Sequence, residues 1–223
     1  MRLILPLLFG LAGAAVLISL GFWQLQRLDW KTGVIARIEA RIDAEPVPLP
    51  ADPDPAKDNF VPVALTGQVA GDPLRVLGAW RGAGSGYRIV VPVLTDGGRR
   101  VLVDLGVVPL DAARAAALPL PGQPVTLTGN LNWPDDRDDG TPPPDGDTWF
   151  ARDVPAMAAV LQTEPLLVVA RTVEPALAPT PAPVGTEGIR NSHLGYAIQW
   201  FGLAAVWLGM TVFLLWRIRR RTL

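Results

Sequence analysis

Two long apolar segments lie near opposite ends of this chain of 223 residues. No charged residue interrupts Leu3–Gln26 or Ser192–Trp216. Each segment exceeds the roughly 20 residues that a helix needs to span a hydrocarbon core of about 30 Å. Inside lipid a helix satisfies its own backbone polar groups, so both segments are predicted transmembrane helices. The pattern predicts a membrane protein in which two transmembrane helices, residues 3–26 and 191–216, flank a central domain of residues 27–190.

The first apolar segment has a second interpretation, a cleaved signal peptide. Its charged start at Arg2 fits that interpretation, but the apolar run is too long for one. No small-x-small cleavage site follows, because Gly21, Phe22, Trp23 and Gln24 stand there. We therefore predict an uncleaved anchor.

Apolar residues continue at helical spacing after the first span, at Leu28, Ile35, Ile38 and Ile42. This spacing predicts an amphipathic extension of the membrane helix. Prolines in the segment 45–55 should end it.

The rest of the central region has the pattern of an α+β domain with a mainly antiparallel sheet. Strand-like runs follow one another with short turns, and Asp96–Gly98 is a plausible hairpin turn. The predicted strands are 61–69, 74–79, 87–94, 99–108, 125–131 and 166–173, and the predicted short helices are 110–117 and 154–162. Two proline-rich stretches, 134–147 and 175–186, are predicted surface loops or linkers.

Charge is distributed unevenly along the chain. Four arginines crowd the tail 217–223, whereas all 21 acidic residues, with 15 basic ones, lie between the spans. By the positive-inside rule the two short ends, residues 1–2 and 217–223, should be cytoplasmic and the central domain extracytoplasmic. No Arg/Ser-rich transit peptide precedes the first span, which favours a bacterial inner membrane with a periplasmic domain over a mitochondrial precursor. The acidic central region argues against nucleic-acid binding.

Catalytic and metal-binding motifs are hard to find in the central region. The chain has no cysteine and one histidine, which excludes thiol chemistry and a Ser/His/Asp triad in the soluble part. The acidic residues of 135–147 do not match an EF-hand loop, so a solvated acidic loop is favoured over a calcium site. Gly82, Gly84 and Gly86 suggest turn geometry rather than a phosphate loop, because no helix follows. We therefore expect no enzymatic activity.

His193 is the single histidine, and it stands at the mouth of the second apolar segment. An ionisable group at a membrane segment suggests a function, and imidazole is a common axial ligand of haem iron. The alternative is an interfacial histidine that hydrogen-bonds to water or headgroups. On a helix, His193, Ala197, Trp200 and Ala204 lie near one face, with Trp200 about 10 Å deeper than His193.

Two sequence signatures at the membrane segments resemble those of the surfeit locus protein 1 family. The first, G-x-W-Q-x-x-R-x-x-W-K, is matched by Gly21, Trp23, Gln24, Arg27, Trp30 and Lys31. The second, N-x-H-L-x-Y-A-x-x-W-F-x-x-A, is matched by Asn191, His193, Leu194, Tyr196, Ala197, Trp200, Phe201 and Ala204. Shorter elements at Gly86, Tyr87 and Pro92 and at Trp149, Phe150, Arg152 and Asp153 also match. The chain departs from the family at 104–109, where Asp-Leu-Gly-Val-Val-Pro replaces an N-R-G-W-V-P run.

The resemblance implies an assembly factor for haem-copper cytochrome c oxidase that binds haem a and helps insert it into the large catalytic subunit. On that basis the expected iron ligand is His193, with Tyr196, Trp200, Trp23 and Arg27 as further haem-binding residues. Arg27 or Arg190 would pair with a propionate. The expected partners are the large oxidase subunit and membrane lipid, and haem a synthase and a second copy of the chain are left open as further partners. The alternative is a structural two-helix scaffold that holds an oxidase subunit without binding a cofactor.

Overall fold

The computed structural model describes residues 3–80, 84–113 and 115–220, which form two compact units. One unit holds most of α1 together with α4, and the other, residues 38–185, holds a β domain. Arg2, Gly82 and Arg221, the last of which is one of the four arginines of the tail, lie outside the described residues. The elements in chain order are α1 (Ile4–Ile42), β1 (Val47–Pro48), α2 (Pro55–Asp58), β2 (Pro62–Val69), β3 (Leu74–Trp80), β4 (Gly84–Thr95), β5 (Arg100–Pro109), β6 (Pro124–Asn132), β7 (Thr148–Trp149), α3 (Val154–Leu161), β8 (Leu167–Glu174) and α4 (His193–Arg220).

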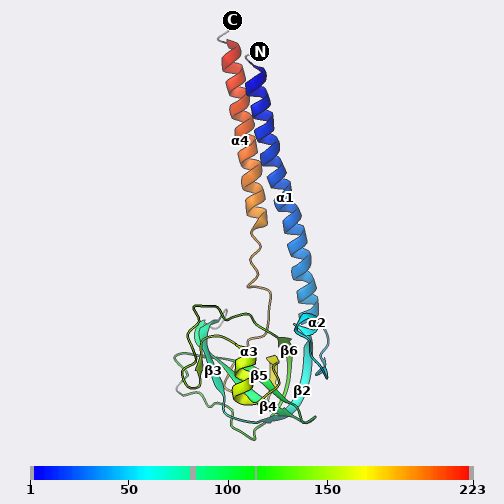
Figure 1. The fold of residues 1–223 in the computed structure, drawn as a ribbon, viewed down its shortest axis with the longest axis vertical. Helices are drawn as coiled ribbons and strands as arrows, with labels where there is room; N and C mark the ends of the chain where they lie inside the picture. Colours follow the sequence, from blue (N-terminus) through cyan, green and yellow to red (C-terminus); the bar gives the residue numbers. More distant parts are fainter. Residues whose placement is uncertain (1–2, 81–83, 114, 221–223) are drawn as a thin grey trace. The chain divides into compact units, whose positions relative to one another are not determined.

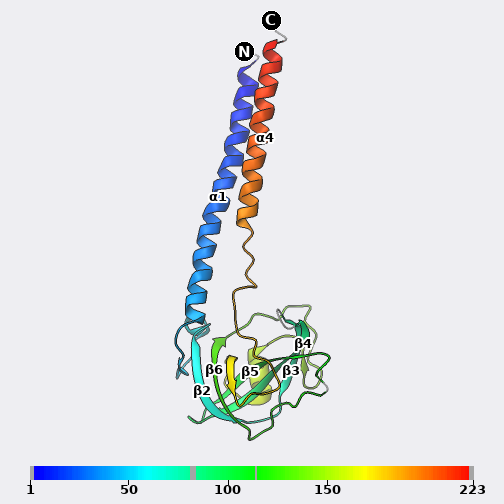
Figure 2. The ribbon, with the colours of Figure 1, turned by 180° about the vertical axis from the view of Figure 1, so that it is seen from behind.

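Both predicted membrane helices are present, and α1 and α4 are long and apolar enough to cross a membrane. The extension predicted after the first span is confirmed, because α1 continues without a break to Ile42 and ends before the proline-rich segment. Within their unit α1 and α4 run antiparallel and side by side, so that the N-terminal end of α1 lies beside the C-terminal end of α4 (Figures 1 and 2).

The β domain is built on a closed ring of five strands. The sheet order is β1-β2-β6-β8-β5-β4-β3-β7, and a further pairing of β2 with β4 closes the ring β2-β6-β8-β5-β4. In the ring only β5 and β8 pair in parallel, so the predicted mainly antiparallel sheet is confirmed. The closing contact is short, with Gly67, Gln68 and Val69 opposite Thr95, Leu94 and Val93. A Cβ on Gly67 would lie 2.2 Å from the Leu94 carbonyl oxygen, so this close approach requires glycine.

Two apolar clusters stabilise the domain. Alternate residues of the ring strands form one cluster, in which Ile89, Val91, Val103, Leu127 and Val168 are at most 2 % exposed. The second cluster packs α3 against the sheet, with Met157 of α3 fully buried among residues of β3, β4, β5 and β8. Adjacent residues of β4, β5 and β8 fall in different clusters, so both faces of these strands lie in a core.

The predicted helix at 110–117 is wrong, because its described residues form turns. The Ala112 amide donates to the Pro109 carbonyl, and the Ala116 amide donates to the Ala112 carbonyl. A segment of this length forms a helix only where tertiary packing offsets the cost of nucleation, as the buried Val154, Met157 and Ala158 do in α3. None of the described residues of 110–117 is buried. The proline that follows Leu118 also disfavours helical backbone at Leu118. The Asp96–Gly98 hairpin turn, by contrast, is confirmed by a bond from the Gly98 amide to the Thr95 carbonyl.

A buried ion pair joins β4 to β5. Asp104 of β5 is fully buried and lies 2.6 Å from Arg88 Nε of β4. Burial raises the pKa of the Asp104 carboxyl, against the lowering effect of the Arg88 and Arg152 guanidinium groups. The carboxylate also accepts a bond from the Gly106 amide, and Arg88 reaches on to the carbonyl of Ala182. The pair therefore links two ring strands to the segment that follows β8.

Three acidic residues between 135 and 153, Asp136, Asp147 and Asp153, form ion pairs with arginines. Asp136 accepts two bonds from Arg152, and Asp147 lies 3.4 Å from Arg75. Over residues 3–80, 84–113 and 115–220, no three histidine or acidic side chains come together as a metal site would need. These carboxylates act as ion-pair partners on the surface of the β domain.

Candidate functional site

Small residues bring α1 and α4 into close contact. Ala14 of α1 and Ala197 and Ala204 of α4 are buried between the helices. A Cβ built on Gly10 would lie only 2.1 Å from Thr211 Cγ2, and one on Gly21 would lie 2.6 Å from the Phe201 ring. Without a hydrophobic driving force between helices in lipid, such close backbone packing is what holds a pair together. These residues therefore fix how α1 faces α4.

Polar atoms within this helix pair are matched with one another. The indole N–H of Trp207 donates to the Gly10 carbonyl at 2.9 Å, and the Thr211 hydroxyl donates to the Trp207 carbonyl at 2.8 Å. An unmatched N–H would be costly in hydrocarbon. Trp207 also packs on Phe9, with 5.4 Å between ring centroids.

The contact that defines the site joins His193 to Gln24. His193 is the first residue of α4, and its Nδ1 lies 2.7 Å from the side-chain oxygen of Gln24 on α1. Because an amide oxygen only accepts, Nδ1 donates, and a neutral imidazole then carries its lone pair on Nε2. Gln24 is 9 % exposed, so its packing holds the acceptor in place. The arrangement leaves Nε2 of His193 suited to act as a metal ligand.

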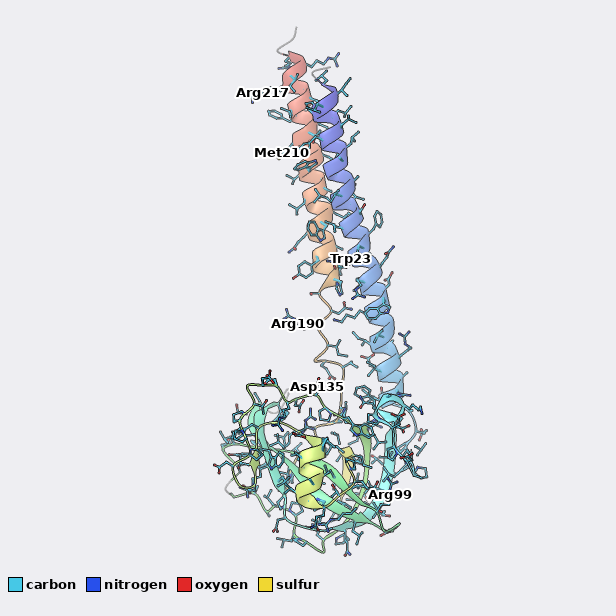
Figure 3. All side chains as sticks on the ribbon, in the orientation of Figure 1. Trp23, Arg99, Asp135, Arg190, Met210 and Arg217 are labelled. Carbon is cyan, nitrogen blue, oxygen red and sulfur yellow. The ribbon has the colours of Figure 1, made fainter. Side chains whose placement is uncertain are left out.

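Further polar contacts connect α1 to the residues that precede His193. Lys31 donates to the carbonyl of Arg190, and the Asn191 amide donates to the Thr32 hydroxyl at 3.3 Å. The side-chain oxygen of Asn191 is buried without a hydrogen-bond partner. Arg190 and Trp23 are both labelled near the end of the helix pair at which α4 begins (Figure 3). Lys31 and Arg190 therefore place two cationic residues near the start of α4, where His193 lies.

One flank of the helix pair carries the predicted site residues Tyr196, Trp200 and Trp23. Tyr196 and Trp200 stand seven positions before Leu203 and Trp207, so by helical spacing they share a face of α4 with them. Trp23 stands seven positions after Val16 on α1 and shares its face in the same way. Val16, Leu203 and Trp207 line one groove between the helices. The candidate residues of both helices thus lie along the same flank.

The predicted residues are not all in contact with one another. The side chain of α1 that contacts His193 is Gln24, rather than Trp23 or Arg27. Trp23 is 52 % exposed, and the guanidinium of Arg27 stacks on Trp30 at 4.6 Å. Sequence reasoning assigned no role to Gln24, although a polar residue in an otherwise apolar span is the signal that could have pointed to it.

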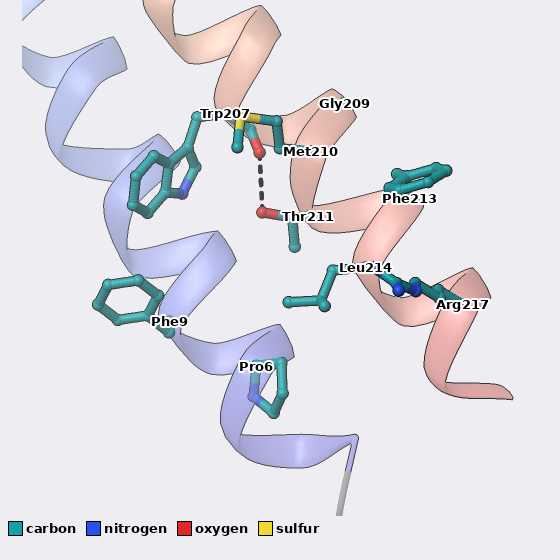
Figure 4. A pocket seen from close by; sticks show the side chains of 9 residues that line it. All are labelled: Pro6, Phe9, Trp207, Gly209, Met210, Thr211, Phe213, Leu214 and Arg217. Atoms are coloured by element: carbon teal, nitrogen blue, oxygen red, sulfur yellow. Dashed lines mark hydrogen bonds between the residues drawn. The ribbon is translucent and has the colours of Figure 1, made fainter. Parts of the chain in front are cut away.

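The groove on this flank continues away from His193. Its first part has a volume of about 530 Å³ and is lined by apolar side chains of both helices. A second part of about 490 Å³ shares Phe9, Trp207 and Met210 with the first and ends at Arg217. Figure 4 shows Pro6 and Phe9 on α1 facing the α4 residues of this second part.

The residues at His193 fit a haem in their donor chemistry. A neutral imidazole whose Nδ1 donates to an amide oxygen is a normal axial ligand, because an outer hydrogen bond fixes the ring and its tautomer. Aromatic side chains at Tyr196 and Trp200 offer packing surface for a macrocycle. Arg190 and Lys31 supply positive charge for carboxylates.

The fold and the site together define a membrane-anchored β-domain protein with a histidine site between its two membrane helices. Residues 11–205 match the sequence model of the SURF1 family. A mouse protein named Surfeit locus protein 1 is 32 % identical over 216 residues, which cover 86 % of this chain and 69 % of the mouse protein. Its human counterpart is 33 % identical, covering 84 % and 70 %. A SURF1-like protein of Monosiga brevicollis is 32 % identical, covering 89 % and 83 %. The chain belongs to the SURF1 family.

Proposed function

We propose that this protein is an assembly factor for haem-copper cytochrome c oxidase that binds haem a as cargo and passes it to the large catalytic subunit. The observation that supports the proposal is the contact of His193 Nδ1 with the buried Gln24. This contact leaves Nε2 of His193 available to bind iron. Membership of the SURF1 family supports the assembly role. A haem a synthase would supply the cargo.

Each residue of the site has a separate role in this proposal. His193 holds the iron, and Gln24 orients its ring. Trp200 and Tyr196 form the wall against which the macrocycle packs, with Trp23 on the facing helix. Arg190, Lys31 or Arg27 pairs with the propionates.

The proposed location is a bacterial inner membrane with the β domain in the periplasm. Arg217, Arg219 and Arg220 at the end of α4 support a cytoplasmic end for both helices. Reporter fusions near residue 180 should then report the periplasm, and fusions after Leu223 the cytoplasm. A cytoplasmic signal near residue 180 would overturn this orientation.

The test of the cargo proposal is the haem content of His193→Ala. The protein is purified in mild detergent from cells that make haem a, and haem is measured per polypeptide from the absorption spectrum. Wild-type protein should carry haem a, and His193→Ala should lose it or show an altered Soret band. His193→Met should retain haem with a changed reduction potential, since the axial ligand sets the potential. Leu194→Ala, an exposed neighbour on another face, is the matched control and should behave as wild type. An unchanged spectrum in His193→Ala would refute the ligand assignment.

A structural scaffold is the second candidate function. The observation that favours it is that small residues and the Trp207–Gly10 bond pair the two helices directly. A scaffold would retain the large oxidase subunit in pull-downs of His193→Ala at wild-type amounts and would carry no haem in any variant. Loss of haem in His193→Ala from a haem-loaded wild type would exclude it.

A further inference from the structure

The apolar groove beside the candidate haem site has no role in the function proposed above. It runs between α1 and α4 through Val16, Leu203, Val206, Trp207 and Met210. Its walls are apolar, and its one indole N–H is already bonded to the Gly10 carbonyl. The groove therefore offers packing surface and no free polar group at Trp207, which suits a hydrocarbon chain.

Helical spacing places the groove and the candidate site on the same flank of the helix pair. Tyr196 and Trp200 precede Leu203 and Trp207 by one heptad, and Trp23 follows Val16 by one heptad. From Tyr196 to Met210 the helix rises about 21 Å, at 1.5 Å per residue. A ligand seated at His193 against Tyr196 and Trp200 would thus direct a long substituent along this flank into the groove.

We propose that the groove binds the farnesyl chain of the haem, and so selects prenylated haems over haem b. This inference rests on the proposed function, because it requires haem to bind at His193. The groove volume of about 530 Å³ lies in the range of sites for small molecules. The opposite flank has its own hollow, lined by Val212, Leu215 and Trp216, but its residues fall on a different face of α4 from Tyr196 and Trp200. That flank serves as the internal comparison.

The experiment compares haem o with haem b, which differ only in the farnesyl-bearing substituent. Full-length apo-protein in lipid nanodiscs is titrated with each haem, and Kd is measured from the Soret band. Wild type should bind haem o roughly tenfold more tightly than haem b, as expected for added packing along one chain. Val206→Trp fills the groove and should remove this preference while leaving the Kd for haem b unchanged. Val212→Trp makes the same change on the opposite flank, at similar exposure (65 % against 60 %), and should keep the preference.

The outcomes separate this inference from the function on which it rests. Equal affinity of wild type for haem o and haem b would refute the groove proposal and leave haem binding intact. Retained preference in Val206→Trp, as expected if a phospholipid chain fills the groove, would also refute it, as would equal losses in the two tryptophan variants. No binding of either haem by wild type would refute the proposed function itself. An unchanged Kd for haem b shows that a variant is folded. Leu203→Trp fills the same groove from a second position and should also remove the preference for haem o.

Discussion

Gly106 of β5 allows two distant segments of the β domain to approach closely. Its φ is +117°, and a Cβ at this position would lie 2.0 Å from the Thr180 carbonyl oxygen and 2.7 Å from Pro181 Cα. The neighbouring Val107 exchanges two backbone hydrogen bonds with Thr180, at 2.8 and 2.9 Å. Gly106→Ala should therefore both strain the backbone and push the segment 180–182 off the sheet.

The loss of stability can be estimated from these contacts. A side chain held at such a φ costs on the order of 1–3 kcal/mol. Losing the two backbone bonds to Thr180 adds about 0.5–1.5 kcal/mol each. Gly106→Ala should thus lower the free energy of unfolding by about 2–6 kcal/mol. Gly98→Ala is the matched control: Gly98 has φ +78° in a hairpin turn with nothing within 4 Å of its Cβ position, so only the backbone cost applies.

Urea unfolding of the full-length protein in mild detergent, followed by near-ultraviolet circular dichroism, measures the difference. Hydrogen exchange at the Val107 and Thr180 amides should also speed up in Gly106→Ala and stay unchanged in Gly98→Ala. Equal midpoints for the two variants would refute the reasoning, because the close approach to Thr180 would then contribute nothing beyond the backbone conformation.

Three further predictions concern single contacts. Asp153→Ala removes the N-cap of α3 and should lower the free energy of unfolding by about 1 kcal/mol in the same urea assay. Arg99 holds the pKa of Glu164 below its usual value through paired hydrogen bonds. The stability from this pair is present above about pH 4.3 and is lost as pH falls, so Glu164→Gln should show a flatter acid-side stability profile. Gly10→Val should separate the helices at Thr211, which would widen the distance between spin labels at engineered cysteines on the outer turns of α1 and α4.

Each of these variants has a control. Arg137→Met removes the ion pair of Asp153 but keeps its cap, so it should cost less than Asp153→Ala. An acid profile of Glu164→Gln identical to wild type would show that the pair contributes no acid-dependent stability. Gly202→Val places the same side chain in open space on α4, and a spin-label distance that widened equally in this variant would contradict the packing role of Gly10.

Most helices and strands of this fold could be predicted from the sequence because the patterns that indicate them are local. An uninterrupted apolar run identifies a membrane helix, and two strand-like runs separated by turn residues identify the hairpin around Asp96–Gly98. The helix predicted at 110–117 was wrong because so short a helix depends on packing, and none of the described residues of that segment is buried. Propensity alone does not form a helix of that size.

Contacts between residues far apart in the sequence could not be predicted from such local patterns. Nothing near Asp104 in the sequence indicates that Arg88, sixteen residues earlier, neutralises it inside the domain. In the same way His193 could be singled out as the only histidine, but its partner Gln24 is 169 residues away. Which residue of α1 faces it depends on the register of the helix pair, and glycines at Gly10 and Gly21 set that register through space.

The closure of the five-strand ring has a consequence for how the β domain can meet other proteins. Over the described residues, each ring strand pairs with a neighbour on both sides along part of its length. Open edges are left outside the ring, by the short strands β1 and β7 and by the part of β3 that lies beyond its two-residue pairing with β7. A closed ring offers no long template for adding a strand from another chain. Strand exchange, fibril growth and recognition by strand addition are therefore disfavoured. The three-residue join of β2 to β4 is the place where such a template would first be exposed if the ring opened.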